Sequence, residues 1–339
     1  MPKCVLEKVQ QVLAREHTIG GYAAQAEYEN EITAIYEKIS LLINAANPLS
    51  EVALVDSATT GWVRAFYGIP LSSGDIILST AIEYAANYVA ILQQCKRTGA
   101  QLVTLTSDPD TGMTSLADLR SKLQQYGDRV RVVSITWIPT NGGIIDCAAA
   151  IGQVCKELAP QAVYLLDGCQ AVGHIVVDVQ QLQCDVLTAT GRKYLRGPRG
   201  TGFLYVRESA LPKLGEPITL DHEAARLDPS APGGYTLHPT ARRFEQWEKN
   251  VSGLLGLGAA VDYILSRVDM AWADERTRQV AHIMRSRLSA LPGVTVRDLG
   301  AHENQCGIVT FTVESEAPYE IKAALLSKQI YVNVSYPGS

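Results

Sequence analysis

Short β-forming runs alternate with helical patterns between Val52 and about residue 206, and this rhythm restricts the possible folds more than any other feature. The strand-like runs are "VALV" (52–55), "DIILS" (75–79), "QLVTL" (101–105), "RVRVVSIT" (129–136), "AVYLLD" (162–167), "DVLTA" (185–189) and "GTGFLYVR" (200–207). The helical patterns between them are "EYAANYVAILQQCKR" (83–97), "SLADLRSKLQQYG" (115–127) and "CAAAIGQVCKEL" (147–158). Strands that alternate with helices build a parallel sheet covered on both faces, because each parallel connection needs a crossover. We predict an α/β fold with a mostly parallel seven-stranded sheet, whose last two strands form an antiparallel addition.

The two ends of the chain differ from this central part. The first 45 residues have apolar residues at helical spacing, namely Val5, Val9, Val12 and Leu13, then Ile32, Ile35, Ile39 and Leu42. A loop-rich stretch with "DPSAPGG" (228–234) precedes one predicted long helix at 242–268. A charged helix and the runs "LPGVTVRD" (291–298), "GIVTFTVES" (307–315) and "IYVNVS" (330–335) predict a smaller α+β unit. We expect an N-terminal helical segment (1–45), a large domain (46–268) and a small C-terminal domain (269–339).

Composition and charge exclude several classes of protein. A net charge of −5 gives the chain no overall basic character that would indicate nucleic-acid binding. The N-terminus mixes charges into its helical pattern, unlike a signal peptide, and "VSGLLGLGAAVDYIL" (251–265) is too short for a membrane span and carries Asp262. Seven cysteines without a Cys-x-x-Cys pair indicate reduced thiols, and six histidines show no metal-ligand spacing. We expect a cytoplasmic protein that binds no nucleic acid, membrane or metal.

One loop combines positive charge with backbone freedom. The stretch "TATGRKYLRGPRGTGFLYV" (188–206) holds one lysine, three arginines and four glycines between two apolar runs. A solvated loop uses glycine for turns or charge for solubility, but seldom both so densely. The loop therefore indicates an anionic ligand, or a lysine with a chemical role.

Residues at the ends of the predicted strands form the candidate site, because ligands of an open parallel sheet bind beyond the carboxyl ends of its strands. These residues are Asp167 with Cys169 and Gln170, Thr190 with Arg192 and Lys193, Thr140 with Asn141, and the helix-opening turn "SATTG" (57–61). Pyridoxal phosphate needs such a set: a lysine for its Schiff base, a carboxylate that raises the pKa of its ring nitrogen, and a helix N-terminus for its phosphate. Taken alone, a lysine is usually solvated and a strand-end aspartate often caps a turn, so the prediction rests on the whole set.

The stretch "YLLDGCQAVGHIVVDV…CDVLTATGRKYLRGPRGTGFLYV" closely resembles the class V aminotransferase group of fold-type I pyridoxal-phosphate enzymes, and the resemblance runs along the whole chain. That group contains cysteine desulfurases, selenocysteine lyases, isopenicillin N epimerase and cysteine C–S lyases. The resemblance implies a homodimer. It also implies that Asp167 pairs with the pyridinium, Gln170 and Asn141 lie by the phenolic oxygen, Lys193 carries the cofactor, Tyr84 stacks on its ring, and Ala58, Thr59, Thr190 and Arg192 hold its phosphate.

The reaction is not determined by the fold. Three stretches are most similar in sequence to the lyase branch: "GRKYLRGPRGTGFLYV", "IEYAANYVA" and "ARRFEQWEKN". We therefore expect C–S cleavage of a cysteine derivative, with Lys193 moving the α-proton. Cys306 does not match the late loop cysteine of desulfurases, and Gln246–Trp247 replace the small-residue turn with which many of them reach the partner's phosphate. The alternatives are a desulfurase, an aminotransferase or an epimerase. A non-catalytic homologue acting as an interaction module is a different class of alternative, against which the intact Asp167–Lys193 pair argues.

The resemblance also predicts that the chain is a fragment of a longer protein, or a decayed gene product. Relatives begin with a short strand and a loop before the helix that here starts at "PKCVLEKV". They continue past "VNVSYPGS" with an arginine that clamps the substrate carboxylate. Without that clamp we expect weak cofactor binding and poor turnover. Arg242 or Arg243 is the first candidate if a clamp is present.

Overall fold

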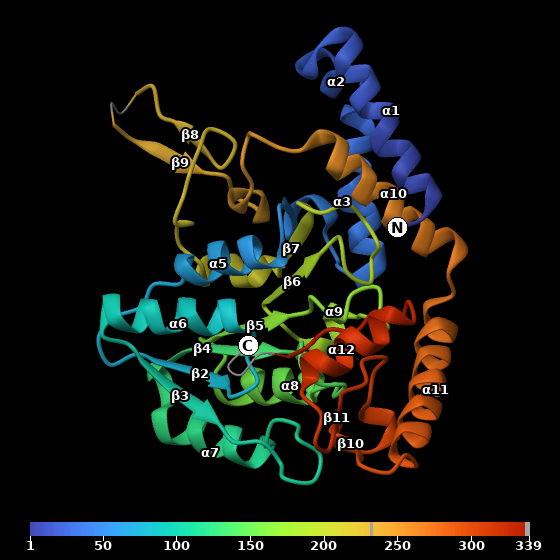
Figure 1. Ribbon diagram of the computed structural model, residues 1–339. Coiled ribbons are helices and arrows are strands. Elements are labelled where there is room, and N and C mark those ends of the chain that lie inside the picture. Colours follow the sequence, from blue (N-terminus) through green and yellow to red (C-terminus); the bar gives the residue numbers. More distant parts are fainter. Residues whose placement is uncertain (231–232, 336–339) are drawn as a thin grey trace.

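A seven-stranded sheet lies at the centre of the computed structural model, which describes residues 1–230 and 233–335 (Figure 1). Its strands are β1 (Val52–Val55), β2 (Ile76–Thr80), β3 (Gln101–Leu105), β4 (Val130–Thr136), β5 (Val163–Asp167), β6 (Val186–Thr190) and β7 (Gly202–Val206). They lie in the order β1-β7-β6-β5-β4-β2-β3. Neighbours from β3 to β6 pair in parallel, whereas β7 pairs antiparallel with both β6 and β1. The predicted fold class is confirmed, including the antiparallel addition.

Helices cover both faces of this sheet. The helices are α1 (Lys3–Ile19), α2 (Gly21–Glu27), α3 (Glu29–Ile43), α4 (Pro48–Glu51), α5 (Ala58–Gly68), α6 (Ala85–Thr98), α7 (Leu116–Tyr126), α8 (Ala148–Leu158), α9 (Val179–Leu182), α10 (Val251–Arg267), α11 (Met270–Ser289) and α12 (Pro318–Ser327). One apolar cluster joins the sheet to α3, α7, α8 and α10, and a second joins its other face to α5 and α6. Among the described residues, no single helix is long and apolar enough to cross a membrane; only α10 and α11 taken together pass such a test, and they bend by 88°.

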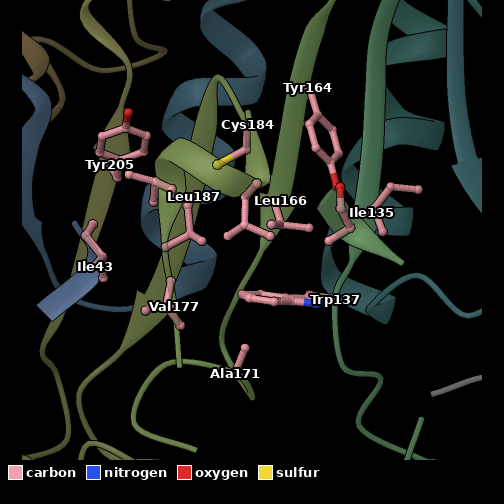
Figure 2. Packing of buried hydrophobic residues seen from close by; sticks show 14 of the residues in the cluster. Ile43, Ile135, Trp137, Tyr164, Leu166, Ala171, Val177, Cys184, Leu187 and Tyr205 are labelled. Carbon is pink, nitrogen blue, oxygen red and sulfur yellow. The ribbon is translucent and has the colours of Figure 1, made fainter. Parts of the chain in front are cut away.

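The pleat of the strands explains how both faces become apolar. Successive side chains of a strand point to opposite faces. In β5, Tyr164 and Leu166 belong to the first cluster, whereas Val163 and Leu165 belong to the second. Figure 2 shows Tyr164, Leu166 and Trp137 within the first cluster. Because both faces are buried, the strands read as nearly continuous apolar runs, as parallel strands do.

The N-terminal helices pack on α10 at one end of the molecule. Val12 of α1 and Tyr28, between α2 and α3, form a small apolar cluster with Val251 and Leu255 of α10. Val12 is fully buried, but Leu13, expected on the same apolar face, is half exposed. The apolar face of α1 is therefore narrower than its sequence pattern indicates.

The predicted long helix at 242–268 is wrong in its first part. Ala241–Phe244 form a 3-10 turn, and α10 begins only at Val251, where Asn250 caps it by accepting a hydrogen bond from Gly253 N–H at 2.8 Å. Glu245 explains the break, because its carboxylate accepts hydrogen bonds from Tyr36 Oη (2.7 Å) and from Leu54 N–H (2.9 Å). These distant partners outweigh the local helical pattern.

The C-terminal part has fewer strands than predicted. "GIVTFTVES" contains only β11 (Phe311–Val313), which pairs with β10 (Val294–Val296), and residues 330–335 ("IYVNVS") form no strand. A strand needs a hydrogen-bonded neighbour, and β10 and β11 pair with each other alone. The loop predicted at "DPSAPGG" joins a small hairpin of β8 (Ala225–Leu227) and β9 (Tyr235–Leu237). Two of its residues, 231 and 232, and the last four residues of "VNVSYPGS" lie outside the described residues.

Candidate active site

A narrow cavity lies where several strands and helices meet at the carboxyl edge of the sheet. Its volume is about 60 Å³, and it is lined by Ser57, Ala58, Thr59, Tyr84, Thr136, Ile138, Thr140, Asp167, Cys169, Gln170, Thr190, Arg192 and Lys193. It thus brings together every residue proposed from the sequence except Asn141. Asn141 lines a neighbouring cavity of about 660 Å³, which shares Tyr84 and Thr140 with the first. A third cavity, of about 430 Å³, shares Gln170 and Lys193 with it.

Asp167 is the buried acid of this cavity. It ends β5 and is only 3% exposed. Its carboxylate accepts hydrogen bonds from Asn87 Nδ2 at 2.8 Å and from Cys169 N–H at 2.9 Å. Burial raises the pKa of Asp167 to about 6, against the lowering effect of these two hydrogen bonds. Such a carboxylate is ready to pair with a cation, because a nearby positive charge favours its ionised form.

Lys193 faces the same cavity from the loop that follows β6. Asp167 lies opposite Thr188 in the parallel pair of β5 and β6, so the loop after Thr190 begins beside the acid. The ammonium group of Lys193 is close enough to Asp167 to favour its ionised form. Cys169 also adjoins Lys193, but burial raises the pKa of its thiol to about 11, so this cysteine is a poor nucleophile.

The N-terminus of α5 forms a cradle for an anion. Ser57 caps this eleven-residue helix by accepting a hydrogen bond from Thr60 N–H at 3.1 Å. The N–H groups of Ala58 and Thr59 belong to the first turn, whose amides have no acceptor within the helix. Gly202 of β7 lies against this turn, since a Cβ there would meet Ala189 O at 2.5 Å and Ser57 Cα at 3.1 Å. Free amides and the helix dipole together suit a phosphate group.

Two further predicted residues border this cradle. Thr190 is buried, and its hydroxyl, which donates to Thr201 O at 3.3 Å, can rotate to donate to an anion in the cavity instead. Arg192 is exposed and lies on the rim of the cavity. These donors therefore lie at the end of the cavity beside α5, while Asp167 lies in its buried wall.

Three polar residues near Asp167 and Tyr84 were missed by sequence reasoning. Asn87 of α6 is fully buried and bonds Asp167, and Thr136 at the end of β4 lines the cavity. Glu83, directly before Tyr84, accepts hydrogen bonds from Asn87 and Thr136. The available signal was the pair of polar residues Glu83 and Asn87 at the start of an otherwise apolar helical pattern, one just before α6 and one in its first turn.

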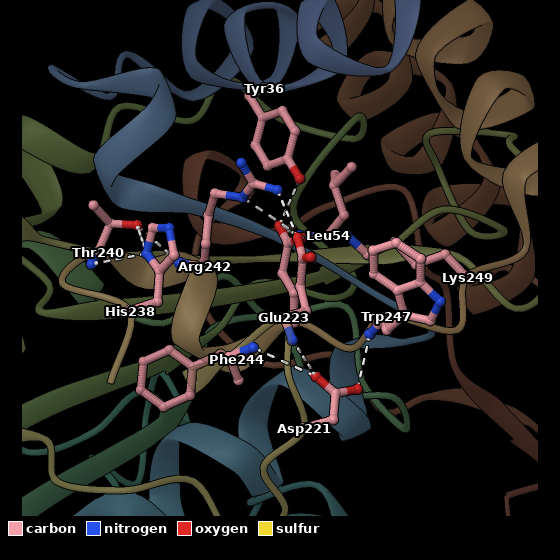
Figure 3. A network of polar contacts seen from close by, with 12 residues as sticks. Tyr36, Leu54, Asp221, Glu223, His238, Thr240, Arg242, Phe244, Trp247 and Lys249 are labelled. Carbon is pink, nitrogen blue, oxygen red and sulfur yellow. Dashed lines mark hydrogen bonds and ion pairs between the residues drawn. The ribbon is translucent and has the colours of Figure 1, made fainter. Parts of the chain in front are cut away.

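The two arginines considered as a substrate clamp lie elsewhere. Figure 3 shows Arg242 in a polar network beside Tyr36, where its guanidinium bonds Glu223 Oε1 at 2.7 Å. Arg243 donates to His238 O at 3.0 Å. Neither lines the narrow cavity. In the same region, Trp247 N–H donates to Asp221 Oδ2 at 2.8 Å, which holds the turn after Glu245 in place.

Comparison with known proteins places this chain in a family. The family described as aminotransferase class V matches residues 1–339. A probable cysteine desulfurase of Halalkalibacterium halodurans is 29% identical over 323 residues, which cover 94% of this chain and 75% of that protein. A cysteine desulfurase of an Enterobacter species is 30% identical over 309 residues, covering 90% of this chain and 73% of that protein.

Solved structures agree in fold. A cysteine desulfurase of Thermococcus onnurineus superposes with a TM-score of 0.83 at 21% identity, covering 98% of this chain and 80% of that one. The cystine C–S lyase C-DES, solved with its product cysteine persulfide, gives a TM-score of 0.85 at 23% identity and covers 98% of this chain and 87% of that one. Fold, cavity and family match agree: the chain belongs to the aminotransferase class V family.

Proposed function

We propose that this protein is a pyridoxal-phosphate-dependent enzyme that cleaves the C–S bond of a cysteine derivative. The observation that carries the proposal is the convergence of Asp167, Lys193 and the N-terminus of α5 on one cavity. Family membership supports it, as do relatives named cysteine desulfurases and a structural neighbour named as a cystine C–S lyase.

The residues of the cavity fit this cofactor. The first amides of α5 and the Thr190 hydroxyl would hold its phosphate, with Arg192 at the rim. Asp167 would face the ring nitrogen, since its burial leaves the carboxylate in need of a cation. Tyr84 offers an aromatic ring for stacking, and the amides of Gln170 and Asn141 would bond the phenolic oxygen. Lys193 would carry the cofactor.

Each polar group then has a defined task. When bound, the cofactor draws electron density away from the α-carbon of an amino acid. Asp167 would keep a proton on the ring nitrogen, because its negative charge lies in a buried wall where water does not screen it. Lys193 would accept the α-proton as a general base. The high pKa of the Cys169 thiol keeps that neighbour of Lys193 neutral.

Cys306 does not have the features of a cysteine that takes up sulfur. A desulfurase needs a reactive, mobile cysteine to take up sulfur. Cys306 is fully buried, burial raises the pKa of its thiol to about 11, and its Sγ accepts a hydrogen bond from Ile308 N–H at 3.4 Å. Of the seven cysteines, only Cys4, at the start of α1, is exposed. In the proposed C–S lyase reaction, the sulfur leaves in the thiol product.

The cofactor assignment is tested by absorbance and labelling. We expect the purified protein, loaded with pyridoxal phosphate, to show a visible absorbance band that Lys193→Ala removes. Borohydride reduction followed by peptide mapping should find the label on Lys193. A label on another lysine would overturn the assignment, and absence of any band in the loaded protein would overturn the proposed function.

The reaction class is tested by its products. An S-substituted cysteine should give pyruvate, ammonia and a thiol with uptake of one water, without any keto acid. Cys306→Ala should keep the rate of pyruvate formation within about twofold, because the Cys306 thiol is buried in the protein interior and does not line the narrow cavity. Alanine together with a protein-bound persulfide would indicate a desulfurase. Dependence on a keto acid would indicate an aminotransferase, and inversion of the α-carbon an epimerase.

We also propose a homodimer in the cytoplasm whose cofactor-binding part is the large domain at 46–268. Seven free cysteines support a reducing compartment. The cavity residues, from Ser57 to Lys193, all fall within the proposed large domain. Light scattering on the purified protein tests the dimer, and limited proteolysis tests the boundaries near residues 46 and 268.

A further inference from the structure

Glu83 is a buried carboxylate held by several hydrogen bonds. It lies just before α6 and is 7% exposed. Its Oε2 accepts hydrogen bonds from Ser79 Oγ at 3.0 Å and Ser134 Oγ at 2.7 Å. Its Oε1 accepts from Tyr84 N–H at 2.9 Å, from Asn87 Nδ2 at 3.1 Å and from Thr136 Oγ1. A carboxylate has about four lone-pair sites, and the Tyr84 N–H is shared with Thr136 Oγ1, so these donors fill the acceptor capacity of Glu83.

Two of those bonds lead to residues of the candidate ring site. The bond from Tyr84 N–H fixes the backbone of the predicted stacking residue, and that same N–H also meets Thr136 Oγ1 at 2.9 Å. The amide of Asn87 bridges two acids, since its Nδ2 donates both to Glu83 and to Asp167 at 2.8 Å. An amide nitrogen carries two protons, so it can serve both carboxylates at once.

The charge of this arrangement is unusual for a protein interior. The five donors to Glu83 are neutral groups, and through Asn87 the site contains a second buried carboxylate. Two buried negative charges in contact through one amide are costly unless a cation joins them. Lys193 supplies one such cation near Asp167, and a protonated ring nitrogen beside Asp167 would be a second.

We propose that Glu83 is a positioning residue for the two side chains that would contact the cofactor ring. It holds Tyr84 through the backbone N–H of that residue, and it holds Asp167 through Asn87. This inference rests on the proposed function. It explains why one acid contacts β2, β4 and α6 together, through Ser79, Ser134 and Asn87. It also assigns a role to the charge of Glu83, which adds to the negative potential felt at the ring nitrogen.

The test compares Glu83→Gln with the matched variant Glu51→Gln in the loaded protein. Glu51 is also buried, at 3% exposed, and also accepts several hydrogen bonds, among them those from Ala46 N–H (2.9 Å) and Glu208 N–H (3.0 Å). None of these residues lines the narrow cavity. Both substitutions keep size and remove one buried charge, so general destabilisation affects both variants.

Three measurements are made: the dissociation constant of pyridoxal phosphate, the visible circular dichroism per bound cofactor, and the pH midpoint of the visible absorbance. For Glu83→Gln we expect the dissociation constant to rise about tenfold, as for loss of a hydrogen bond to a charged group. The dichroism should fall, because the ring is no longer held in one orientation. The pH midpoint should move down, because removal of a negative charge disfavours the cationic form. Glu51→Gln should lower the melting temperature only.

A second variant separates charge from position. Glu83→Asp keeps the charge but shortens the side chain, so we expect a midpoint near that of the wild type together with reduced dichroism. If Glu83→Gln and Glu51→Gln change all three measurements equally, Glu83 is merely structural and the inference is wrong. If the wild-type protein itself binds no pyridoxal phosphate, the proposed function fails instead, so the two failures are distinguishable.

Discussion

At the scale of single residues, burial of Asp167 lowers the free energy of unfolding of the cofactor-free protein and favours binding of a cation beside its carboxylate. Its carboxylate is buried, and burial raises its pKa to about 6 from a value near 4 in an unfolded chain. Between about pH 4 and pH 6 the native protein without cofactor therefore binds more protons than the unfolded chain. The contribution of Asp167 to the free energy of unfolding consequently falls as the pH rises through this window. A bound cation reverses this penalty.

Asp167→Asn should remove that pH dependence in the cofactor-free protein. We expect the variant to gain stability relative to the wild type as the pH rises from 4 to 7, by a difference on the order of 2 kcal/mol. Urea unfolding at a series of pH values measures it. Parallel stability curves for the two proteins would show that Asp167 titrates normally in the fold.

The same variant should be nearly inactive when loaded with cofactor. Asparagine keeps the size of the side chain but carries no charge to hold the ring proton. We expect the rate of C–S cleavage to fall by about three powers of ten or more, equivalent to roughly 4 kcal/mol of barrier. Single-turnover kinetics measures the fall. Unchanged turnover would mean that another group serves the ring nitrogen.

At the scale of elements, the proposed phosphate cradle depends on the close approach of β7 to the start of α5. The point of approach is Gly202, which is paired with Thr190 on one side and Val55 on the other. No side chain fits there, because a Cβ would meet Ala189 O at 2.5 Å. The glycine therefore lets one strand lie beside the turn at Ser57, and the cap at Ser57 keeps the first amides of α5 directed outward.

Gly202→Ala should force β7 apart from β6 at Ala189 and press on the turn at Ser57 that begins α5. We expect a loss of about 1–3 kcal/mol in stability, as for other overpacked sites, and a weaker affinity for pyridoxal phosphate. The matched control is Gly21→Ala in α2, where a Cβ meets nothing within 4 Å and alanine suits a helix. Chemical unfolding and a cofactor titration measure both effects. A normal affinity in Gly202→Ala would contradict the cradle.

At the scale of the whole molecule, His174 connects the C-terminal part of the chain to Gln170, which lines the narrow cavity. Its Nδ1 donates to Gln170 O at 3.1 Å, which leaves Nε2 to accept from Gly307 N–H at 3.0 Å. Its ring stacks on Tyr194 with centroids 3.8 Å apart. The bond from Gly307 needs the neutral ring, because a protonated Nε2 cannot accept, and burial lowers the pKa of His174. On α11, Asp274 favours its charged form and Arg278 disfavours it.

Acid should loosen this link. Because the folded-state pKa of His174 lies below the unfolded value near 6.5, the stability that its neutral form contributes is lost as the pH falls through the folded pKa. We expect amide exchange at Gly307 and Ile308, corrected for the intrinsic rate, to speed up below about pH 6. His174→Phe, which retains an aromatic ring beside Tyr194, should exchange quickly at every pH. Equal protection of the wild type from pH 5 to pH 8 would contradict this role.

The sequence by itself determined the α/β rhythm and the residues that end the strands. Parallel topology brings strand ends to one edge, so Asp167 and Lys193 could be placed together from local patterns alone. The start of α10, the burial of Cys306 and the Glu83–Asn87–Asp167 contacts were decided only by the tertiary structure. Asn87 and Asp167, for example, lie 80 residues apart in the chain and meet through one hydrogen bond. The physical reason is that strand and helix periodicity is encoded locally, whereas buried polar groups take whichever partners the packed fold brings within reach.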